Sequence, residues 1–172
     1  RAPCGNTPPS RPPDPAGTDL LRLALAGERA SALVLGHTRW ASIGIISQPN
    51  AHPVDSLELE GERGPFVTAT LNGDVDNFAD VKSAGGLRLA AEITTDAKVI
   101  PTLVSHRLAE GADLTTAFRD TVASFEGSVA IAAAAAPHPG RLLLALRGSG
   151  QARYVRIADG CYVVTSVRYA LV

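Results

Sequence analysis

The chain has 172 residues, of which 45% are hydrophobic and 19% are charged, and its formal net charge is −1. This length fits one domain with a substantial buried core, and the balanced charge argues against a nucleic-acid-binding surface or a polybasic membrane anchor. No apolar run approaches the roughly 20 residues that cross a bilayer, so we expect a soluble protein. The two cysteines, Cys4 and Cys161, do not suggest a disulfide framework, so we expect a cytoplasmic location.

The first part of the chain is rich in proline. Residues 1–17, RAPCGNTPPSRPPDPAG, hold six of the twelve prolines. Because proline supplies no backbone donor, we interpret this segment as a linker or insertion. Ordered structure is expected over 18–172, beginning with a short helix at Thr18-Asp19. The next apolar run, SALVLGH at 31–37, predicts a strand.

The middle of the chain predicts a strand and then a helix. The run PFVTATL favours a strand that enters a turn at Asn72-Gly73. The stretch TTDAKVIPTLVSHRLAEG favours a helix capped by Thr95 or Asp96. Pro101 lies inside this helical pattern and therefore predicts either a kink or a delayed helix start.

The remaining elements predict the fold class. DLTTAFRDTVASFEG has helical periodicity, with Asp113 as the N-cap and Gly127 as the stop. SVAIAAAAA, RLLLALRG, ARYVRIA and CYVVTSV are short runs separated by turn residues, which is typical of antiparallel strands. Cys161, in the last of these runs, is expected to be buried and inert. Helices between two strand-rich regions predict an α+β fold with a helix layer against antiparallel sheets.

Four polar clusters interrupt the apolar pattern. Each one alone has an ordinary structural explanation: a charge at a strand end, a loop, a hairpin turn and a helix cap. A buried guanidinium nevertheless needs an opposite charge or hydrogen bonds to replace its lost hydration, so the first cluster raises the question of its partner. The clusters are Arg39-Trp40, Asn50 to Pro53, Asn72 to Asn77, and Thr94 to Asp96.

The order and form of these clusters resemble a known family. GHTRWAS, NAHP, NGDVDN and TTDAKVI follow one another as in the class II, N-terminal-nucleophile glutamine amidotransferases. Over residues 31–172 the chain looks most similar to the glutaminase half of glutamine–fructose-6-phosphate amidotransferase (glucosamine-6-phosphate synthase). The resemblance implies an N-terminal-nucleophile-type layered fold with antiparallel sheets, and a domain that releases ammonia from glutamine for amino-sugar phosphate synthesis.

The resemblance also implies how the substrate is held. Free glutamine is a zwitterion at its α-carbon, so a selective site needs a cation and an anion at a fixed separation. The arginine that matches Arg39 would bind the α-carboxylate, for which a planar guanidinium is suited. The aspartate that matches Asp96 would receive the α-ammonium. The other positions implied to line or support the site are Trp40, Ser42, His52 and Asn77.

The implied reaction passes through a γ-glutamyl thioester. Asn72 and Gly73 would form the oxyanion hole, and such donors typically supply ~3 kcal/mol each. The family's nucleophile is a cysteine at the processed N-terminus, whose α-amine acts as base. Cys4-Gly5 is the nearby match in this chain, but three residues precede it and the proline-rich segment that follows does not predict the family's apolar strand. We therefore leave open whether Cys4 is the nucleophile or whether that cysteine lies upstream or is lost.

Other departures from the family motif affect the expected activity. Ile43 stands where the family has a histidine, and Lys98 stands where the family has an acidic residue. A degenerate, non-catalytic domain for glutamine sensing or partner docking therefore remains an alternative, as does an amide hydrolase with another substrate. Because the chain begins at Arg1 and ends at Val172 directly after a predicted strand, we expect it to be truncated at both ends.

The resemblance defines the expected ligands and partners. We expect L-glutamine as the substrate, with no cofactor and no metal. The ammonia acceptor would be bound by a sugar-phosphate isomerase or synthase domain, in the same or another chain. A homodimer is possible, and no nucleic-acid or membrane partner is expected.

Overall fold

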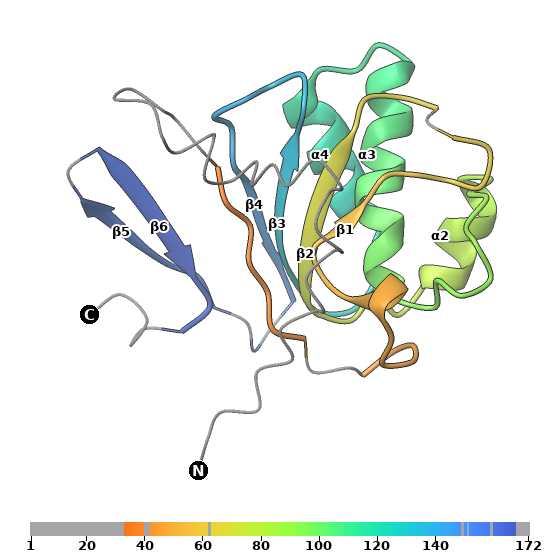
Figure 1. The fold of residues 1–172 in the computed structure, drawn as a ribbon, viewed down its shortest axis with the longest axis horizontal. Coiled ribbons are helices and arrows are strands. Elements are labelled where there is room, and N and C mark those ends of the chain that lie inside the picture. The colour runs from red at the N-terminus through yellow and green to blue at the C-terminus, as the bar shows by residue number, and fades with distance from the viewer. Residues whose placement is uncertain are drawn as a thin grey trace, which may run out of the picture.

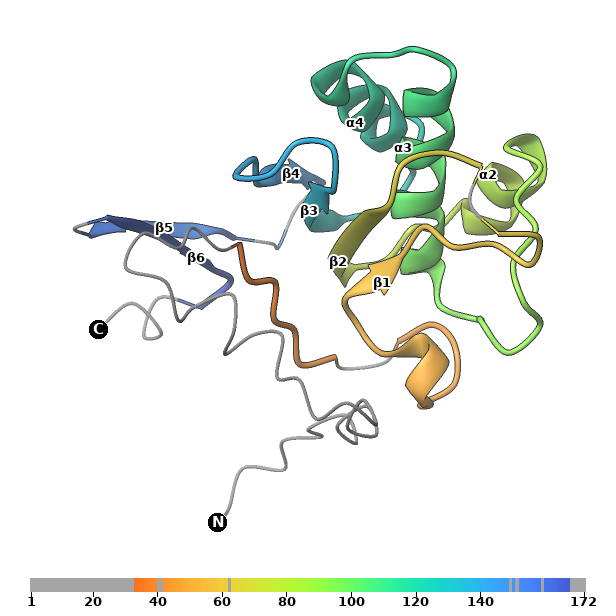
Figure 2. The ribbon, with the colours of Figure 1, turned by 45° about the horizontal axis from the view of Figure 1, so that its top comes forward.

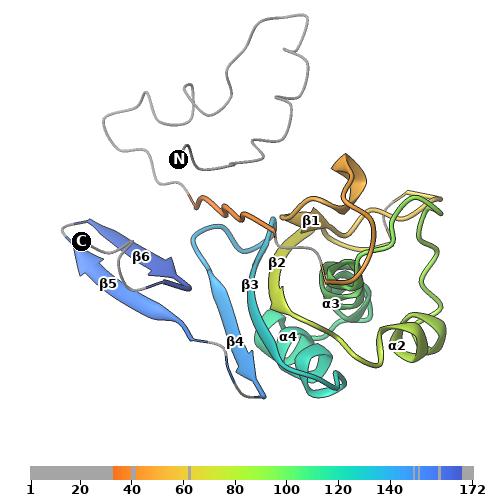
Figure 3. The same cartoon turned by 90° about the horizontal axis from the view of Figure 1, so that it is seen from below.

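The computed structural model describes residues 33–39, 42–61, 63–148, 150, 152–158 and 160–167. A four-stranded antiparallel sheet, in the order β1-β2-β3-β4, carries helices α3 and α4 on one face, with α2 packed beside α3 (Figures 1 and 3). A two-stranded sheet, β5-β6, lies beside β4. The strands are β1 Val54–Asp55, β2 Val67–Gly73, β3 Val129–Ala135, β4 Leu143–Arg147, β5 Tyr154–Ala158 and β6 Cys161–Thr165. The helices are α2 Phe78–Ala84, α3 Val99–Ala109 and α4 Leu114–Ala123, with short 3-10 turns η1 Gln48–Asn50 and η2 Asp96–Lys98.

The core lies between the sheet and the helices. β2 and β3 pair over seven residues, from Val67 opposite Ala135 to Gly73 opposite Val129. Alternate residues are buried against the helices, as the two-residue period of a strand requires: Val67, Ala69 and Leu71 on β2, and Val129, Ile131, Ala133 and Ala135 on β3. Ile131 is fully buried in this layer, a burial that contributes roughly 1.5–3 kcal/mol. The opposite face of β2 and β3 carries threonine, asparagine and alanine side chains.

The helix predictions are largely confirmed. Asp113 caps α4 by accepting hydrogen bonds from the N–H groups of Thr115 and Thr116. α3 begins at Val99, after the 3-10 turn η2, so the presence of Pro101 corresponds to a delayed start rather than a helix from residue 95 or 96. Pro101 falls in the first turn of α3, where its missing N–H costs no intrahelical bond.

α4 ends earlier than predicted, at Ala123 rather than near Gly127. The Ser124 hydroxyl donates to the carbonyl of Thr121, and the Asn77 side chain donates to the carbonyl of Ser124. These side-chain bonds take over carbonyl groups at the helix end, and they stop the helix without a glycine.

Three other sequence-based expectations are wrong. Residues 33–39 form no strand, although they run along the sheet side opposite the helices (Figure 2). Asn72 and Gly73 belong to β2 itself and not to a hairpin turn, because both pair with β3. Cys161 is exposed rather than buried, because the β5-β6 sheet has no covering layer among the described residues. The segment 1–17, the first predicted helix and the domain boundary at residue 18 lie outside the described residues.

Candidate functional site

The four polar clusters meet at the end of β2 that carries Gly73. The side-chain oxygen of Asn50 accepts from the N–H of Thr94 at 2.7 Å and from the N–H of Thr95 at 2.9 Å. The carboxylate of Asp96 accepts from the N–H of Val75 at 2.8 Å. Direct hydrogen bonds therefore connect the second, third and fourth clusters, which are separated by 21 to 45 positions in the sequence.

Arg39 supplies the link to the first cluster. Its guanidinium donates to three main-chain carbonyls: those of Ile43, of Ile45 at 3.3 Å and of Asn50 at 3.1 Å. These three carbonyls are the partners of the Arg39 charge. No acidic side chain among the described residues pairs with it. An arginine has five N–H donors. Nε–H and one Nη2 hydrogen therefore stay without a partner in the described part of the chain, where they are available to a carboxylate.

Asp96 provides the opposite charge. Its side chain is 4% exposed and accepts hydrogen bonds from the N–H groups of Val75 and of Ala97, the latter at 3.0 Å. Burial, and then the negative charge of Asp74, raise the pKa of Asp96, while the hydrogen bond from Val75 acts in the opposite direction. Two neighbouring carboxylates with no cation bonded to them in the described chain make this position favourable for an ammonium group.

The loop after Arg39 closes against the turn that carries Asp96. Ile45 donates its N–H to the Thr94 hydroxyl at 3.0 Å, and the Ser42 hydroxyl donates to the Asp74 carboxylate. Gly44 has a φ of 84°, and a Cβ atom there would lie 2.8 Å from Thr94, so only glycine permits this close approach. Ser42 therefore contacts an acidic neighbour of Asp96.

Gly73 and Asn72 lie at the end of β2. Gly73 has a φ of 109°, and a Cβ atom at this position would lie 1.9 Å from the carbonyl oxygen of Ser128. A glycine is therefore required where β2 ends beside β3. The Asn72 side chain is exposed on the face opposite the helices and makes no hydrogen bond within the described residues. Its exposed amide carries donors that a bound group could accept.

His52 lies next to Thr95 and His37. Its Nε2 is 3.3 Å from the Thr95 hydroxyl, and its ring centroid is 4.7 Å from that of His37. Burial, and then the charges of His37 and Arg39, lower the pKa of His52 to about 4. The imidazole is therefore neutral near neutral pH, and it supports the Thr95 segment as a hydrogen-bonding group and not as a charge.

The low pKa of His52 predicts a loss of stability in acid. The unfolded imidazole titrates near 6.5 and the folded one near 4, so the unfolded state binds the extra proton first and stability falls as pH falls below about 6.5. Between pH 8 and pH 5, we expect His52 to account for a loss of about 1 to 2 kcal/mol, reduced by solvent at its half-buried ring. Urea unfolding at both pH values should show a smaller loss for His52→Gln than for the wild type. Equal losses would contradict the prediction.

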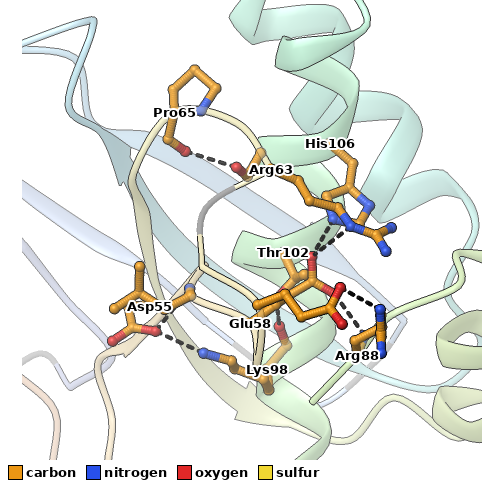
Figure 4. Close-up of polar contacts among 11 residues, drawn as sticks. Asp55, Glu58, Arg63, Pro65, Arg88, Lys98, Thr102 and His106 are labelled. Carbon is orange, nitrogen blue, oxygen red and sulfur yellow. Dashed lines mark hydrogen bonds and ion pairs between the residues drawn. The ribbon is translucent and has the colours of Figure 1, made fainter.

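A polar seam holds α3, and with it the turn of Asp96, against residues 55–65 (Figure 4). Lys98 is 3% exposed and pairs with Asp55 at 2.6 Å, so its charge is neutralised at β1. Two turns further along α3, His106 bonds to the Glu58 carboxylate at 2.6 Å. Burial tends to raise the pKa of Glu58, but the N–H of Arg88 and the His106 side chain outweigh it and lower that pKa. The charge of Lys98 is evident in the sequence, whereas its pairing with Asp55 is not.

Several sequence-predicted residues lie elsewhere. Cys4 and Trp40 are outside the described residues. Asn77 binds the loop between α4 and β3, donating to the Ser124 carbonyl at 3.0 Å and accepting from the Glu126 N–H at 2.9 Å. Asn50, Asp74 and Thr95 lie inside the polar clusters seen in the sequence, but the sequence did not indicate their roles in the site.

The described residues give no metal site and no membrane span. Within them, no group of three or more His, Cys, Asp or Glu side chains is placed to hold a metal ion. None of the helices in the described part is both long and apolar enough to cross a bilayer. A cavity of about 390 Å³ lies at the other end of β2, beside Leu33, Leu35 and Phe66, away from the four clusters.

Comparison with known proteins identifies the family. No family model matches the chain. Glutamine–fructose-6-phosphate aminotransferase (isomerizing) from Neisseria meningitidis serogroup A is 36% identical over 116 residues, which are 66% of this chain and 18% of the relative. The enzymes of the same name from Chlamydia pneumoniae and Bacillus thuringiensis subsp. konkukian are 34% and 31% identical, over 76% and 83% of this chain and 21% and 22% of the relatives. The chain carries a class II glutamine amidotransferase domain. It spans about a fifth of the length of these relatives.

The fold of the amidotransferase domain agrees with this assignment. The solved structure of glutamine phosphoribosylpyrophosphate amidotransferase from B. subtilis, complexed with ADP and GMP, matches with a TM-score of 0.58 and 16% identity, over 74% of this chain and 26% of that chain. At this identity the likeness concerns the fold. It confirms the predicted α+β fold of the N-terminal-nucleophile type.

Proposed function

We propose that the amidotransferase domain binds free L-glutamine and releases ammonia from its side-chain amide. The observation that carries the proposal is that two opposite charges lie on segments joined by one short hydrogen-bond network: Asn50 bonds to Arg39 and to Thr95, which directly precedes Asp96. Arg39 would bind the α-carboxylate with its Nε–H and its second Nη2 hydrogen, which have no partner among the described residues, and Asp96 would receive the α-ammonium. Trp40, Ser42 and His52 complete the proposed binding set.

The proposed chemistry is amide hydrolysis through a thioester. A cysteine thiolate attacks the amide carbon of glutamine, and the tetrahedral oxyanion accepts hydrogen bonds from the Asn72 side chain and the Gly73 N–H. The carbon–nitrogen bond breaks and ammonia leaves with a proton. Water then hydrolyses the thioester to glutamate and restores the thiol. Cys4 is a predicted nucleophile, and its assignment requires a direct test.

The ammonia acceptor follows from the relatives. Because these relatives are named for amino transfer to fructose 6-phosphate, we propose that ammonia from this domain serves amino-sugar phosphate synthesis. A sugar-phosphate isomerase or synthase domain, in the same or another polypeptide, would bind the acceptor.

Ammonia release tests the proposed activity. The full-length gene product, incubated with L-glutamine, should release ammonia and glutamate in equal amounts. Cys4→Ser should abolish release if Cys4 is the nucleophile, whereas Cys161→Ser, at the exposed start of β6, should leave it unchanged. Glutamine binding without ammonia release from the intact wild-type protein would contradict the enzymatic proposal.

A further inference from the structure

Asn50 is the most completely bonded polar side chain of the site. It is fully buried, and its amide nitrogen donates to the Ser47 hydroxyl at 2.7 Å and to the Glu92 carbonyl at 2.9 Å. Its amide oxygen accepts from the N–H groups of Thr94 and Thr95 at 2.7 and 2.9 Å. A carboxamide offers two donors and two acceptor lone pairs, so every hydrogen-bonding position of Asn50 is occupied.

The main chain of Asn50 extends this network to Arg39. Its carbonyl oxygen accepts from Nη1 of Arg39 at 3.1 Å. Thr95, which Asn50 binds through its side chain, directly precedes Asp96. One residue therefore bonds both to the guanidinium and to the segment that carries the carboxylate. Ile45 also bonds to both, because its carbonyl accepts from Arg39 at 3.3 Å and its N–H donates to the Thr94 hydroxyl at 3.0 Å, but it does so with its main chain alone. Asn50 reaches the Thr94–Thr95 segment with its side chain, which a substitution can change.

We propose that Asn50 is a positioning residue that sets the separation between the Arg39 guanidinium and the Asp96 carboxylate, and with it the selectivity for a zwitterionic α-amino acid. This inference rests on the proposed glutamine site. A ligand with two charged ends requires both poles at the correct distance, whereas a ligand with one charged end requires only one of them. A change at Asn50 should therefore lower the affinity for a ligand with two charged ends more than the affinity for a ligand with only one.

The chemistry of the contacts indicates suitable variants. Asn50→Asp keeps the size of the side chain and the oxygen that faces Thr94 and Thr95. It replaces the two N–H donors with an oxygen that faces the Glu92 carbonyl and the Ser47 hydroxyl, so the loop must move. Ser47→Ala is milder, because it removes only one of the four bonds. Ser105→Ala is the matched control: it removes a buried side-chain bond of 2.8 Å to the Pro65 carbonyl, in the polar seam at the far end of α3.

Calorimetric titration with three ligands tests the inference. The ligands are L-glutamine, its analogue without the α-ammonium and its analogue without the α-carboxylate. For folded Asn50→Asp we expect glutamine affinity to fall by about 30-fold or more and affinity for each single-pole analogue to change by less than about 3-fold. Ser47→Ala should lose about 3- to 5-fold for glutamine alone, and Ser105→Ala should retain all three affinities within 2-fold.

The outcomes separate this inference from the proposed function. If the wild type does not bind glutamine, the proposed function fails first. If the wild type binds and folded Asn50→Asp retains its glutamine affinity, or loses affinity for all three ligands by the same factor, the positioning role is overturned. If near-ultraviolet circular dichroism shows that Asn50→Asp is unfolded, Ser47→Ala decides, and unchanged selectivity in that variant overturns the inference.

Discussion

Replacing Asp96 with asparagine should weaken the binding of L-glutamine by roughly 100-fold, while the chain stays folded. Removal of one partner of a desolvated charge pair costs about 3 kcal/mol, or roughly 100-fold in affinity. Folding is less affected, because Asp96 is buried beside Asp74 and its charge is already disfavoured, as its raised pKa shows. The amide oxygen of the variant still accepts from Val75, and relief of the repulsion from Asp74 offsets the lost bond from Ala97.

Calorimetric titration and urea unfolding check these two expectations together. Asp80→Asn, on the exposed surface of α2, removes the same charge outside the site and should change neither result. The affinity of the glutamine analogue without an α-ammonium should be at least as high for Asp96→Asn as for the wild type. Wild-type glutamine affinity in folded Asp96→Asn would show that the ammonium binds elsewhere.

Replacing Gly73 with alanine should destabilise the domain by about 3 kcal/mol or more. The alanine must adopt a φ of 109°, which L residues rarely adopt, and its Cβ would lie 1.9 Å from the Ser128 carbonyl oxygen. Relief of that overlap requires β2 to move away from β3 at the last pair of their ladder, Gly73 opposite Val129. The expected loss is a large fraction of the stability of an ordinary domain.

Gly140→Ala separates the cost of the positive φ from the cost of the close contact with Ser128. Gly140 also has a positive φ, of 81°, but a Cβ atom there meets nothing within 4 Å. Its replacement should cost only about 1 kcal/mol from the backbone conformation. The difference between the two variants in urea unfolding then measures the steric contact with Ser128. Equal losses would mean that the approach of Gly73 to Ser128 contributes nothing.

Local patterns in the sequence predicted the elements whose signals are themselves local. The Asp113 cap depends on N–H groups two and three residues away, and β3 is defined by its own apolar run. The end of α4 was mispredicted because it depends on Asn77, 47 positions from Ser124. Cys161 was mispredicted because an apolar run indicates a strand and does not indicate whether another layer covers it.

In the candidate site too, features with a motif in the sequence could be predicted, and features that depend on distant contacts could not. Motif order predicted that Arg39, Asn72 and Asp96 belong to one site, and the structure brings their segments together. The role of Asn50 could not be predicted, because an asparagine in a loop has many ordinary uses and its four partners lie 3 to 45 positions away. The partner of the Arg39 charge was also unpredictable, since main-chain carbonyls leave no trace in the sequence.

The polar seam along α3 has a mechanical consequence. Two helices or a helix and a sheet that meet through leucine and valine side chains can slide past each other, because dispersion contacts are non-directional. The Lys98–Asp55 and His106–Glu58 pairs sit eight residues apart, about 12 Å along the helix axis, and both break if α3 shifts by one residue. The two ion pairs can form together only at one position of α3 along its axis. Asp96 is the first residue of the 3-10 turn that leads directly into α3, so these two ion pairs also help to fix where the Asp96 carboxylate lies in the site.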